Sequence, residues 1–113
     1  MSAIIAQYLA IWNERDAARR EAAIKATLTP DSVYSDPDYA GIEGHAALSQ
    51  AVGTGQKKFG DLVFSLGEII SQHHDKVLFT WRLGAPGSTV AVATGYDYVE
   101  LQDGLISRVV GFF

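Results

Sequence analysis

The sequence of 113 residues contains no cysteine, only three prolines and no long run of apolar residues. The absence of cysteine excludes disulfide bonds and thiolate chemistry. No apolar stretch approaches the roughly 20 residues that a membrane-spanning helix needs. No Pro/Ser-rich linker or shift in composition divides the chain, which predicts one domain over residues 1–113.

Basic residues are also scarce, with 9 Lys and Arg against 13 Asp and Glu and a net charge of −4. The adjacent cations Arg19-Arg20 and Lys57-Lys58 are far apart and are not interleaved with aromatic residues. This pattern argues against nucleic acid as a partner. Residues 1–7 carry no basic side chain and so lack the start of a secretory signal, and we expect a cytoplasmic protein with no membrane partner.

What the sequence does contain is helical periodicity in its first half. The predicted helices contain Ile5, Leu9 and Trp12 in the first, residues 17–28 in the second, and Leu48, Val52 and Phe59 in the third. Asp16 is placed to cap the second helix, which should stop at Thr29-Pro30 because the residue before a proline leaves the helical region. A short strand over residues 32–35 and a loop over residues 36–44 should separate the second and third helices.

From Leu62 onward the pattern changes to strands. The expected strands are residues 62–73, 77–83, 89–101 and 105–112, divided by His74-Asp75-Lys76, Gly84-Ala85-Pro86-Gly87 and Asp103-Gly104. Turns of this kind join antiparallel neighbours. Gly67 and Gly95 should let two long strands bend. The prediction is an α+β fold with a curved antiparallel sheet and helices on its concave side.

Asp97 is the one charged residue in an otherwise apolar row of the strand over residues 89–101. The period of two places it on one face with Ala91, Ala93 and Gly95, whose small size suggests a cavity. A carboxyl group in that position should have a raised pKa and act as a hydrogen-bond donor. The alternative interpretation is a structural ion pair with Arg82 or Arg108.

Asp36 and Tyr8 are two further candidate site residues, and each also has an ordinary structural interpretation. Asp36 stands in Ser35-Asp36-Pro37-Asp38, where an aspartate commonly accepts hydrogen bonds from turn amides. Tyr8 lies on the inner edge of the first helix, where an aromatic residue commonly belongs to the core. A carboxylate with two neutral donors is, however, the equipment for moving a proton next to a carbonyl group.

Several stretches give the chain a family resemblance. They are Tyr8-Leu9-Ala10-Ile11-Trp12-Asn13-Glu14-Arg15-Asp16, Leu28-Thr29-Pro30-Asp31-Ser32-Val33-Tyr34-Ser35-Asp36-Pro37, Gly41-Ile42-Glu43-Gly44-His45-Ala46-Ala47-Leu48, Asp97-Tyr98 and Asp103-Gly104-Leu105-Ile106. With these, the whole chain resembles the NTF2-like superfamily, and within it the SnoaL-like and ketosteroid-isomerase-like proteins. The resemblance implies a cone-shaped α+β fold with three helices against a curved sheet.

The resemblance also implies roles for individual residues. In the isomerases of this family a tyrosine of the first helix and a protonated aspartate in the penultimate strand donate to the enolate oxygen. Tyr8 and Asp97 match these donors, and Asp36 matches the general base, with Asp38 as a rival carboxylate. The expected cavity is lined further by Trp12, Phe59, Ala93, Gly95 and Phe112.

The implied activity is cofactor-free proton transfer on a hydrophobic, steroid- or polyketide-like ketone, with no metal. One alternative is a binding module without turnover, and another is an epoxide-hydrolase or cyclase activity in which Arg82 or Arg108 joins two aspartates. A homodimer is expected through the sheet face that carries Val90, Val92, Tyr96 and Tyr98. The remaining candidates have plain explanations: His73 and His74 fall in a hairpin turn, and His45 opens a helix either at the cavity mouth or on the surface.

Overall fold

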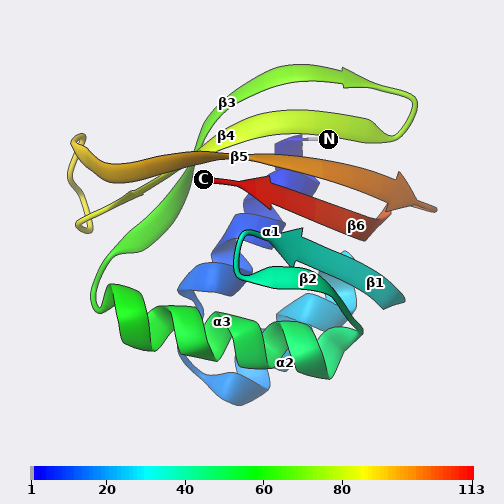
Figure 1. Cartoon of the computed structure of the whole chain (residues 1–113), viewed down its shortest axis with the longest axis horizontal. Coiled ribbons are helices and arrows are strands. Elements are labelled where there is room, and N and C mark those ends of the chain that lie inside the picture. Colours follow the sequence, from blue (N-terminus) through cyan, green and yellow to red (C-terminus); the bar gives the residue numbers. More distant parts are fainter. Residues whose placement is uncertain (1) are drawn as a thin grey trace.

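A computed structural model describes residues 2–113, and Met1 lies outside them. Three helices and six strands make up the fold. In chain order they are α1 (Ser2–Asn13), α2 (Ala17–Thr27), β1 (Leu28–Asp36), β2 (Tyr39–Glu43), α3 (His45–Phe59), β3 (Val63–His73), β4 (Lys76–Gly84), β5 (Ala91–Gln102) and β6 (Leu105–Phe112). Figure 1 shows the strands arching over α1, while α3 runs along the β1–β2 hairpin. The predicted α+β fold with a curved sheet is therefore confirmed.

The six strands form one sheet in the order β2-β1-β6-β5-β4-β3. All neighbours are antiparallel except β1 and β6, which run parallel with Tyr34 opposite Val109 and Ser35 opposite Val110. The sheet is therefore mixed, where the sequence predicted an antiparallel one. The parallel pair joins two segments from opposite halves of the chain, and no local turn signal marks such a pairing.

The start of the sheet also differs from expectation. Asp16 caps α2 as predicted, because its carboxylate accepts from the backbone N–H of Arg19 at 2.9 Å. The helix ends at Thr27, and β1 begins directly at Leu28. Pro30 is tolerated inside β1 because it falls within the irregular stretch of the β1–β6 ladder between Leu28 and Val33. The segment expected as a loop forms the short edge strand β2.

Curvature and turns follow the glycine and turn signals closely. Gly67 lies against β4, where a Cβ atom would be only 2.2 Å from Oγ1 of Thr80. The β3–β4 register shifts between Leu66 and Ile69, around that glycine, which bends the strand. The hairpin turns have positive φ at His74 and Asp75 and at Asp103 and Gly104, as tight two-residue hairpins require.

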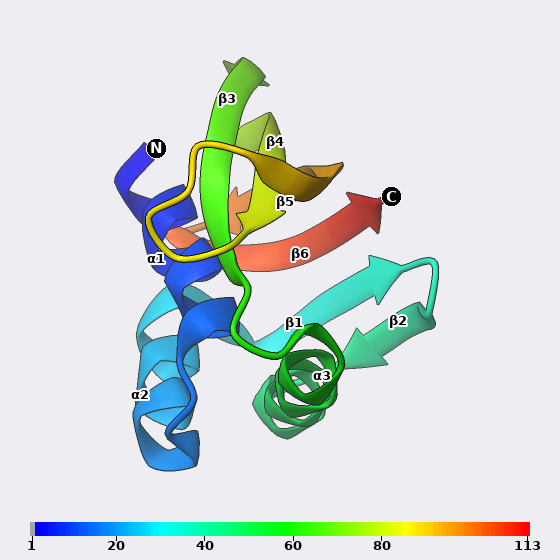
Figure 2. The ribbon, with the colours of Figure 1, turned by 90° about the vertical axis from the view of Figure 1, so that its left-hand side faces the viewer.

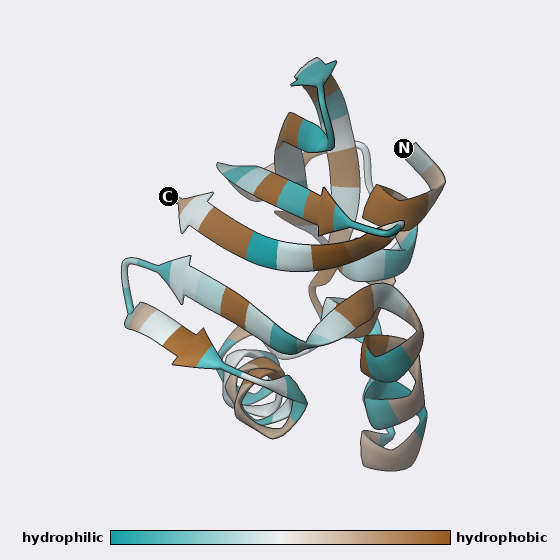
Figure 3. Cartoon of the chain, turned by 90° about the vertical axis from the view of Figure 1, so that its right-hand side faces the viewer, coloured by the Kyte–Doolittle hydropathy of each residue, from teal (hydrophilic) through white to brown (hydrophobic). Residues whose placement is uncertain are grey.

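The core lies between α1 and the inner face of the sheet. Ile5 of α1 packs in one buried cluster with Phe79, Val99 and Val109 from the three central strands. Figure 2 shows the sheet enclosing this space from one side and the helices from the other. Figure 3 shows a hydrophilic stretch between two hydrophobic stretches along β6, the strand that ends at the C-terminus. In residues 2–113, no helix has the length and apolarity needed to cross a membrane.

Two polar clusters fix the helices to the rest of the fold. The side-chain amide of Asn13, at the end of α1, donates to the carbonyl of Phe64 at 2.8 Å and accepts from its N–H at 2.7 Å. The buried Arg20 of α2 donates to the Ser49 hydroxyl and to the Gln56 amide oxygen of α3. These bonds hold α1, α3 and β3 around the space that becomes the site.

Candidate functional site

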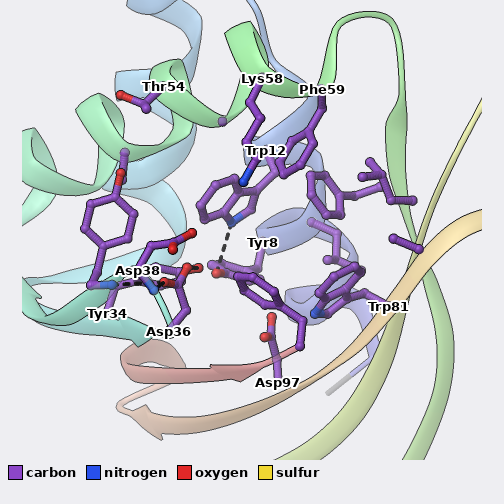
Figure 4. A pocket seen from close by; sticks show the side chains of 18 of the residues that line it. Tyr8, Trp12, Tyr34, Asp36, Asp38, Thr54, Lys58, Phe59, Trp81 and Asp97 are labelled. Carbon is purple, nitrogen blue, oxygen red and sulfur yellow. Dashed lines mark hydrogen bonds between the residues drawn. The ribbon is translucent and has the colours of Figure 1, made fainter.

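A cavity of about 260 Å³ opens between α1, α3 and the inner face of the sheet. Its walls are mainly apolar and aromatic, with a small number of polar groups. The cavity brings together the three residues predicted to act in proton transfer, Tyr8, Asp36 and Asp97, although they come from α1, β1 and β5. Figure 4 shows their side chains converging on the same space.

The expected lining residues divide into two groups. Trp12, Phe59 and Ala93 line the cavity, whereas Gly95 and Phe112 do not. The space above Gly95 is filled, because a Cβ atom there would be 2.2 Å from Cζ2 of Trp81. Phe112 lies on the outer face, 56% exposed, and the next residue, Phe113, reaches the cavity in its place. The sequence showed which positions were small, but not which side chain occupied the space beside them.

Tyr8 lies at the floor of the cavity and is 1% exposed. Its hydroxyl oxygen accepts a hydrogen bond from Nε1 of Trp12, one helical turn later, at 3.0 Å. Burial, together with the nearby charge of Asp97, raises the pKa of Tyr8 well above its usual value. The hydroxyl therefore keeps its proton. Because its oxygen already accepts from Trp12, that proton is available for donation to a ligand.

Asp97 lies in the middle of β5, opposite Phe79 of β4 and Gly111 of β6, and is 6% exposed. Burial raises the pKa of its carboxyl group to about 8; the Trp81 indole partly opposes this shift and the charge of Asp36 adds to it. At neutral pH the group is therefore largely protonated and able to donate.

Neither arginine considered as an ion-pair partner is bonded to Asp97. Arg108 pairs with Glu100 at 3.5 Å on the solvent-exposed side of the sheet, and Arg82 donates to the carbonyl of Thr89. Both lie outside the cavity lining. Asp97 is thus a buried acid without a cationic partner among residues 2–113, which favours its expected protonated state over the structural ion pair.

Asp36 ends β1, which is separated from β5 only by β6 in the sheet. Its Oδ1 atom accepts from the backbone N–H groups of Asp38 at 2.7 Å and Tyr39 at 3.1 Å. Its Oδ2 atom accepts from the hydroxyl of Tyr34, whose pKa is raised by burial and by the surrounding acidic groups. Asp36 therefore accepts hydrogen bonds from its turn, as the ordinary interpretation predicted, and it also lines the cavity.

Gly111 of β6 lies between the two aspartates, because its strand separates β1 from β5. A Cβ atom at this position would be 2.9 Å from Oδ1 of Asp97 and 3.4 Å from Cβ of Asp36. A larger residue would occupy the space that Asp97 now uses. The missing side chain thus allows two acids on non-adjacent strands to approach each other over the middle strand.

A continuous series of aromatic rings forms the wall of the cavity. Trp12 lies at the centre, with its ring centroid 5.5 Å from that of Tyr34 and 6.0 Å from that of Phe64. The series continues from Tyr34 to Tyr39 at 6.2 Å, and from Phe64 to Trp81 at 5.3 Å. Tilted and edge-on contacts of this kind give a firm apolar surface.

The sequence analysis did not assign Tyr34, Phe64 or Trp81 to the site. For Tyr34 a signal existed, since it precedes Asp36 by two residues and must share its face of the strand. For Trp81 and Phe64 the signal is tertiary, because each comes from a strand whose pairing decides which face turns inward. At the cavity mouth lie three exposed polar residues, Asp38, Thr54 and Lys58.

The histidines lie away from this chemistry. His45 contacts the carbonyl oxygens of Leu28 and Thr29 at 3.0 and 2.9 Å through Nε2, which fixes the start of α3 against β1. His73 and His74 are exposed at the β3–β4 hairpin. In the described chain, no group of three His, Asp or Glu side chains is arranged to hold a metal ion.

Comparisons with known proteins give the family and the fold of the chain. The family model of the SnoaL-like domain matches residues 5–109. A proposed isomerase of the SnoaL-like family from Agrobacterium tumefaciens is similar, with 33% identity, a TM-score of 0.86 and coverage of 97% of this chain and 93% of that one. No curated protein matches the chain in sequence.

More distant solved structures share the fold. A proposed polyketide cyclase from Sinorhizobium meliloti has 20% identity and a TM-score of 0.73 over 96% of this chain and 93% of its own. A proposed ketosteroid isomerase from Kribbella flavida has 22% identity and a TM-score of 0.69 over 97% of this chain and 74% of its own.

Proposed function

The chain belongs to the SnoaL-like family, and on that basis we propose that its cavity binds a hydrophobic ketone and moves a proton next to the carbonyl group without a cofactor. The ligand would be a steroid- or polyketide-like molecule, which suits an apolar cavity with a few convergent polar groups. The similarity to a proposed isomerase at 33% identity supports this class of reaction.

The proposed mechanism assigns one role to each of the three residues. Asp36, as the carboxylate, takes a proton from the carbon next to the ketone and returns it at another carbon. Tyr8 and Asp97 donate hydrogen bonds to the ketone oxygen, which becomes an enolate oxygen as the proton leaves. Each donor of this kind contributes about 2.7–4 kcal/mol of transition-state stabilisation in measured oxyanion sites.

One observation carries the proposal: a buried carboxyl group with a raised pKa and a buried tyrosine hydroxyl line the same apolar cavity as Asp36. An Asp97 with a purely structural role would be expected to pair with a cation or to accept from several backbone N–H groups. Among residues 2–113, no cation forms an ion pair with Asp97. The arrangement is useful for donation to a ligand oxygen and costly for stability alone.

A second candidate function is ligand binding without turnover. It is favoured by the hydrogen bonds of Asp36, because Oδ1 already accepts from two amides and Oδ2 from Tyr34. An epoxide-hydrolase or cyclase activity has less support, because Arg82 and Arg108 lie outside the cavity lining. The enzyme and the binding module therefore differ in whether Asp36 acts as a base.

We propose in addition that the protein is a cytoplasmic homodimer that associates through the outer face of the sheet. Val92 and Tyr96 of β5 are 65% and 51% exposed, and Val90, directly before this strand, is 70% exposed. Tyr98 is half-buried, and its hydroxyl donates to Glu100 at 2.7 Å. An apolar surface of this kind favours self-association. Light scattering at micromolar concentration should return twice the chain mass of 12.2 kDa, and a monomer would refute the dimer.

The test of the proposed function combines binding and exchange. A planar phenol such as 2-naphthol mimics the enolate, and exchange of the α-protons of a β,γ-unsaturated ketone with D₂O reports proton removal. Tyr8→Phe and Asp97→Ala should each weaken both phenol binding and exchange, and their effects should not add, because both donors serve one oxygen. If the wild type binds phenols but exchanges no ketone of a panel, the binding module is the better account.

A further inference from the structure

Lys58 is the one basic side chain that lines the cavity among residues 2–113. It comes from the last turn of α3, four residues after Thr54, so both face the cavity mouth from the same side of the helix. Figure 4 shows the Lys58 side chain extending from α3 toward Trp12, with its ammonium group over the aromatic wall. The neighbouring Lys57 is exposed and does not line the cavity.

The ammonium group of Lys58 has no carboxylate partner in the described chain, although Asp36, Asp38 and Asp97 line the same cavity. It lies over the ring of Phe59, whose centroid is 5.8 Å from Nζ. A cation over aromatic rings, beside an apolar space, attracts an anion more strongly than a cation already paired with an acid.

The polar groups of the cavity are thus separated by position. The donors and the base lie at the sheet side, on α1, β1 and β5, and Lys58 lies at the α3 side, with the aromatic wall between them. Asp38, on the β1–β2 turn, adds negative charge at the other side of the mouth. An anionic ligand group would be repelled there and attracted to Lys58, which fixes the direction in which such a ligand enters.

We propose that Lys58 forms a subsite for an anionic substituent of the ligand, such as a carboxylate, while the ketone or phenol end lies at Tyr8 and Asp97. This inference rests on the proposed function, because it requires that the ligand occupy the cavity in that orientation. It narrows the substrate class from any hydrophobic ketone to one that carries an acidic group at the end remote from the reacting carbonyl.

The test uses two probes of almost the same shape, 6-hydroxy-2-naphthoate and its methyl ester. Both present a phenol to Tyr8 and Asp97, but only the first carries a charge for Lys58. The measured quantity is the ratio of the two dissociation constants, determined by calorimetry at low ionic strength. Comparing this ratio between variants cancels the cost of desolvating the carboxylate, which is common to all of them.

Lys58→Gln should shift that ratio against the carboxylate by about two- to fivefold, the range for a largely exposed ion pair, and Lys58→Glu should shift it further. Lys57→Gln and Lys57→Glu change the net charge equally and should leave the ratio unchanged. The preference should also diminish in 0.5 M NaCl, because salt screens exposed charges.

The outcomes separate the two proposals. If the wild type binds both probes and Lys58→Gln leaves the ratio unchanged, the anionic subsite is refuted and the cavity-binding proposal stands. A ratio that shifts as much in the Lys57 variants also refutes the subsite, because the effect is then one of net charge. If the wild type binds neither probe, the proposed function fails, and the subsite fails with it.

Discussion

Strands β1 and β5 each contribute an aspartate to the cavity, and the two aspartates have opposite surroundings. On β5, Asp97 is buried beside Trp81 and Gly111 without a cationic partner among residues 2–113, and burial raises its pKa to about 8. On the β1–β2 wall, Asp36 is half-buried at a strand end and accepts three hydrogen bonds. The comparison shows that surroundings, not residue type, let Asp97 keep its proton, and the proposed mechanism gives the role of proton acceptor to Asp36.

The largest effect is expected when the proposed proton acceptor, Asp36, is replaced. Asp36→Asn should lower the rate of proton exchange by about 10²–10⁴-fold, the usual contribution of a general base, while phenol binding persists because the shape is kept. The measurement is α-proton exchange followed by NMR. Asp38→Asn is the matched control, since it alters the rival carboxylate at the mouth. If Asp38→Asn abolishes exchange and Asp36→Asn does not, the general base is Asp38 and the assignment of Asp36 is wrong.

The next effect concerns how the free energy of unfolding depends on pH, and it tests Asp97. The folded protein holds the Asp97 proton up to a pKa of about 8, whereas a free aspartate loses it near 3.8. The unfolded state therefore binds fewer protons between these values, and the free energy of unfolding falls as the pH rises from about 4 to about 8, by up to about 1.4 kcal/mol per pH unit.

Asp97→Asn should remove that dependence, because the amide is neutral at every pH. Urea unfolding of both proteins at several pH values between 5 and 8 gives the difference, in which other titrating groups cancel. Asp38→Asn should follow the wild type, since Asp38 is exposed. Parallel curves for Asp97→Asn and wild type would mean that Asp97 is ionised in the folded state.

A smaller effect is expected from filling the space at Gly111, between Asp36 and Asp97. Gly111→Ala places a Cβ atom 2.9 Å from the Asp97 carboxyl group, so that group must move. Overpacking of this kind costs about 1–3 kcal/mol of unfolding free energy, and phenol binding should weaken as well. Gly53→Ala is the control, because its Cβ would meet only Arg20 at 3.5 Å and alanine favours the helix by about 0.5–1 kcal/mol. Equal stability of Gly111→Ala and wild type would contradict the crowding.

The smallest effect concerns the Tyr34 hydroxyl, which supplies one of the three donors to Asp36. Tyr34→Phe should lower the free energy of unfolding by about 1 kcal/mol, because the two backbone donors to Asp36 remain. Tyr39→Phe serves as the control, since its ring belongs to the same aromatic wall and no described residue is hydrogen-bonded to its hydroxyl. A loss of equal size in both variants would assign the effect to removal of a tyrosine hydroxyl in general and not to its hydrogen bond with Asp36.

The sequence predicted those features that depend on local pattern. Asp16 as a cap, the Asp103-Gly104 hairpin and the inward face of Asp97 all follow from spacing within a few residues. The parallel β1–β6 pair and the edge strand β2 were not predicted, because their partners lie far away or depend on the sheet already formed.

The same distinction holds for the site. Tyr8, Asp36 and Asp97 were identified through a family resemblance, and the structure places all three in one cavity. Gly95 was expected to leave open space, but the indole of Trp81, paired across the β4–β5 ladder, fills it. Which side chain fills a gap depends on the register between strands, and one strand read alone does not contain that information.

The position of β6 between β1 and β5 has a consequence for how the protein folds. It pairs with a segment from the first third of the chain, so the loop closed by this contact spans most of the sequence and its closure costs entropy before contacts repay it. Within the sheet, β6 alone connects the β1–β2 hairpin to the β3–β4–β5 meander. A partly folded chain that lacks this strand would carry Asp36 and Asp97 on separate pieces, so the proposed cavity exists only once β6 has joined the sheet.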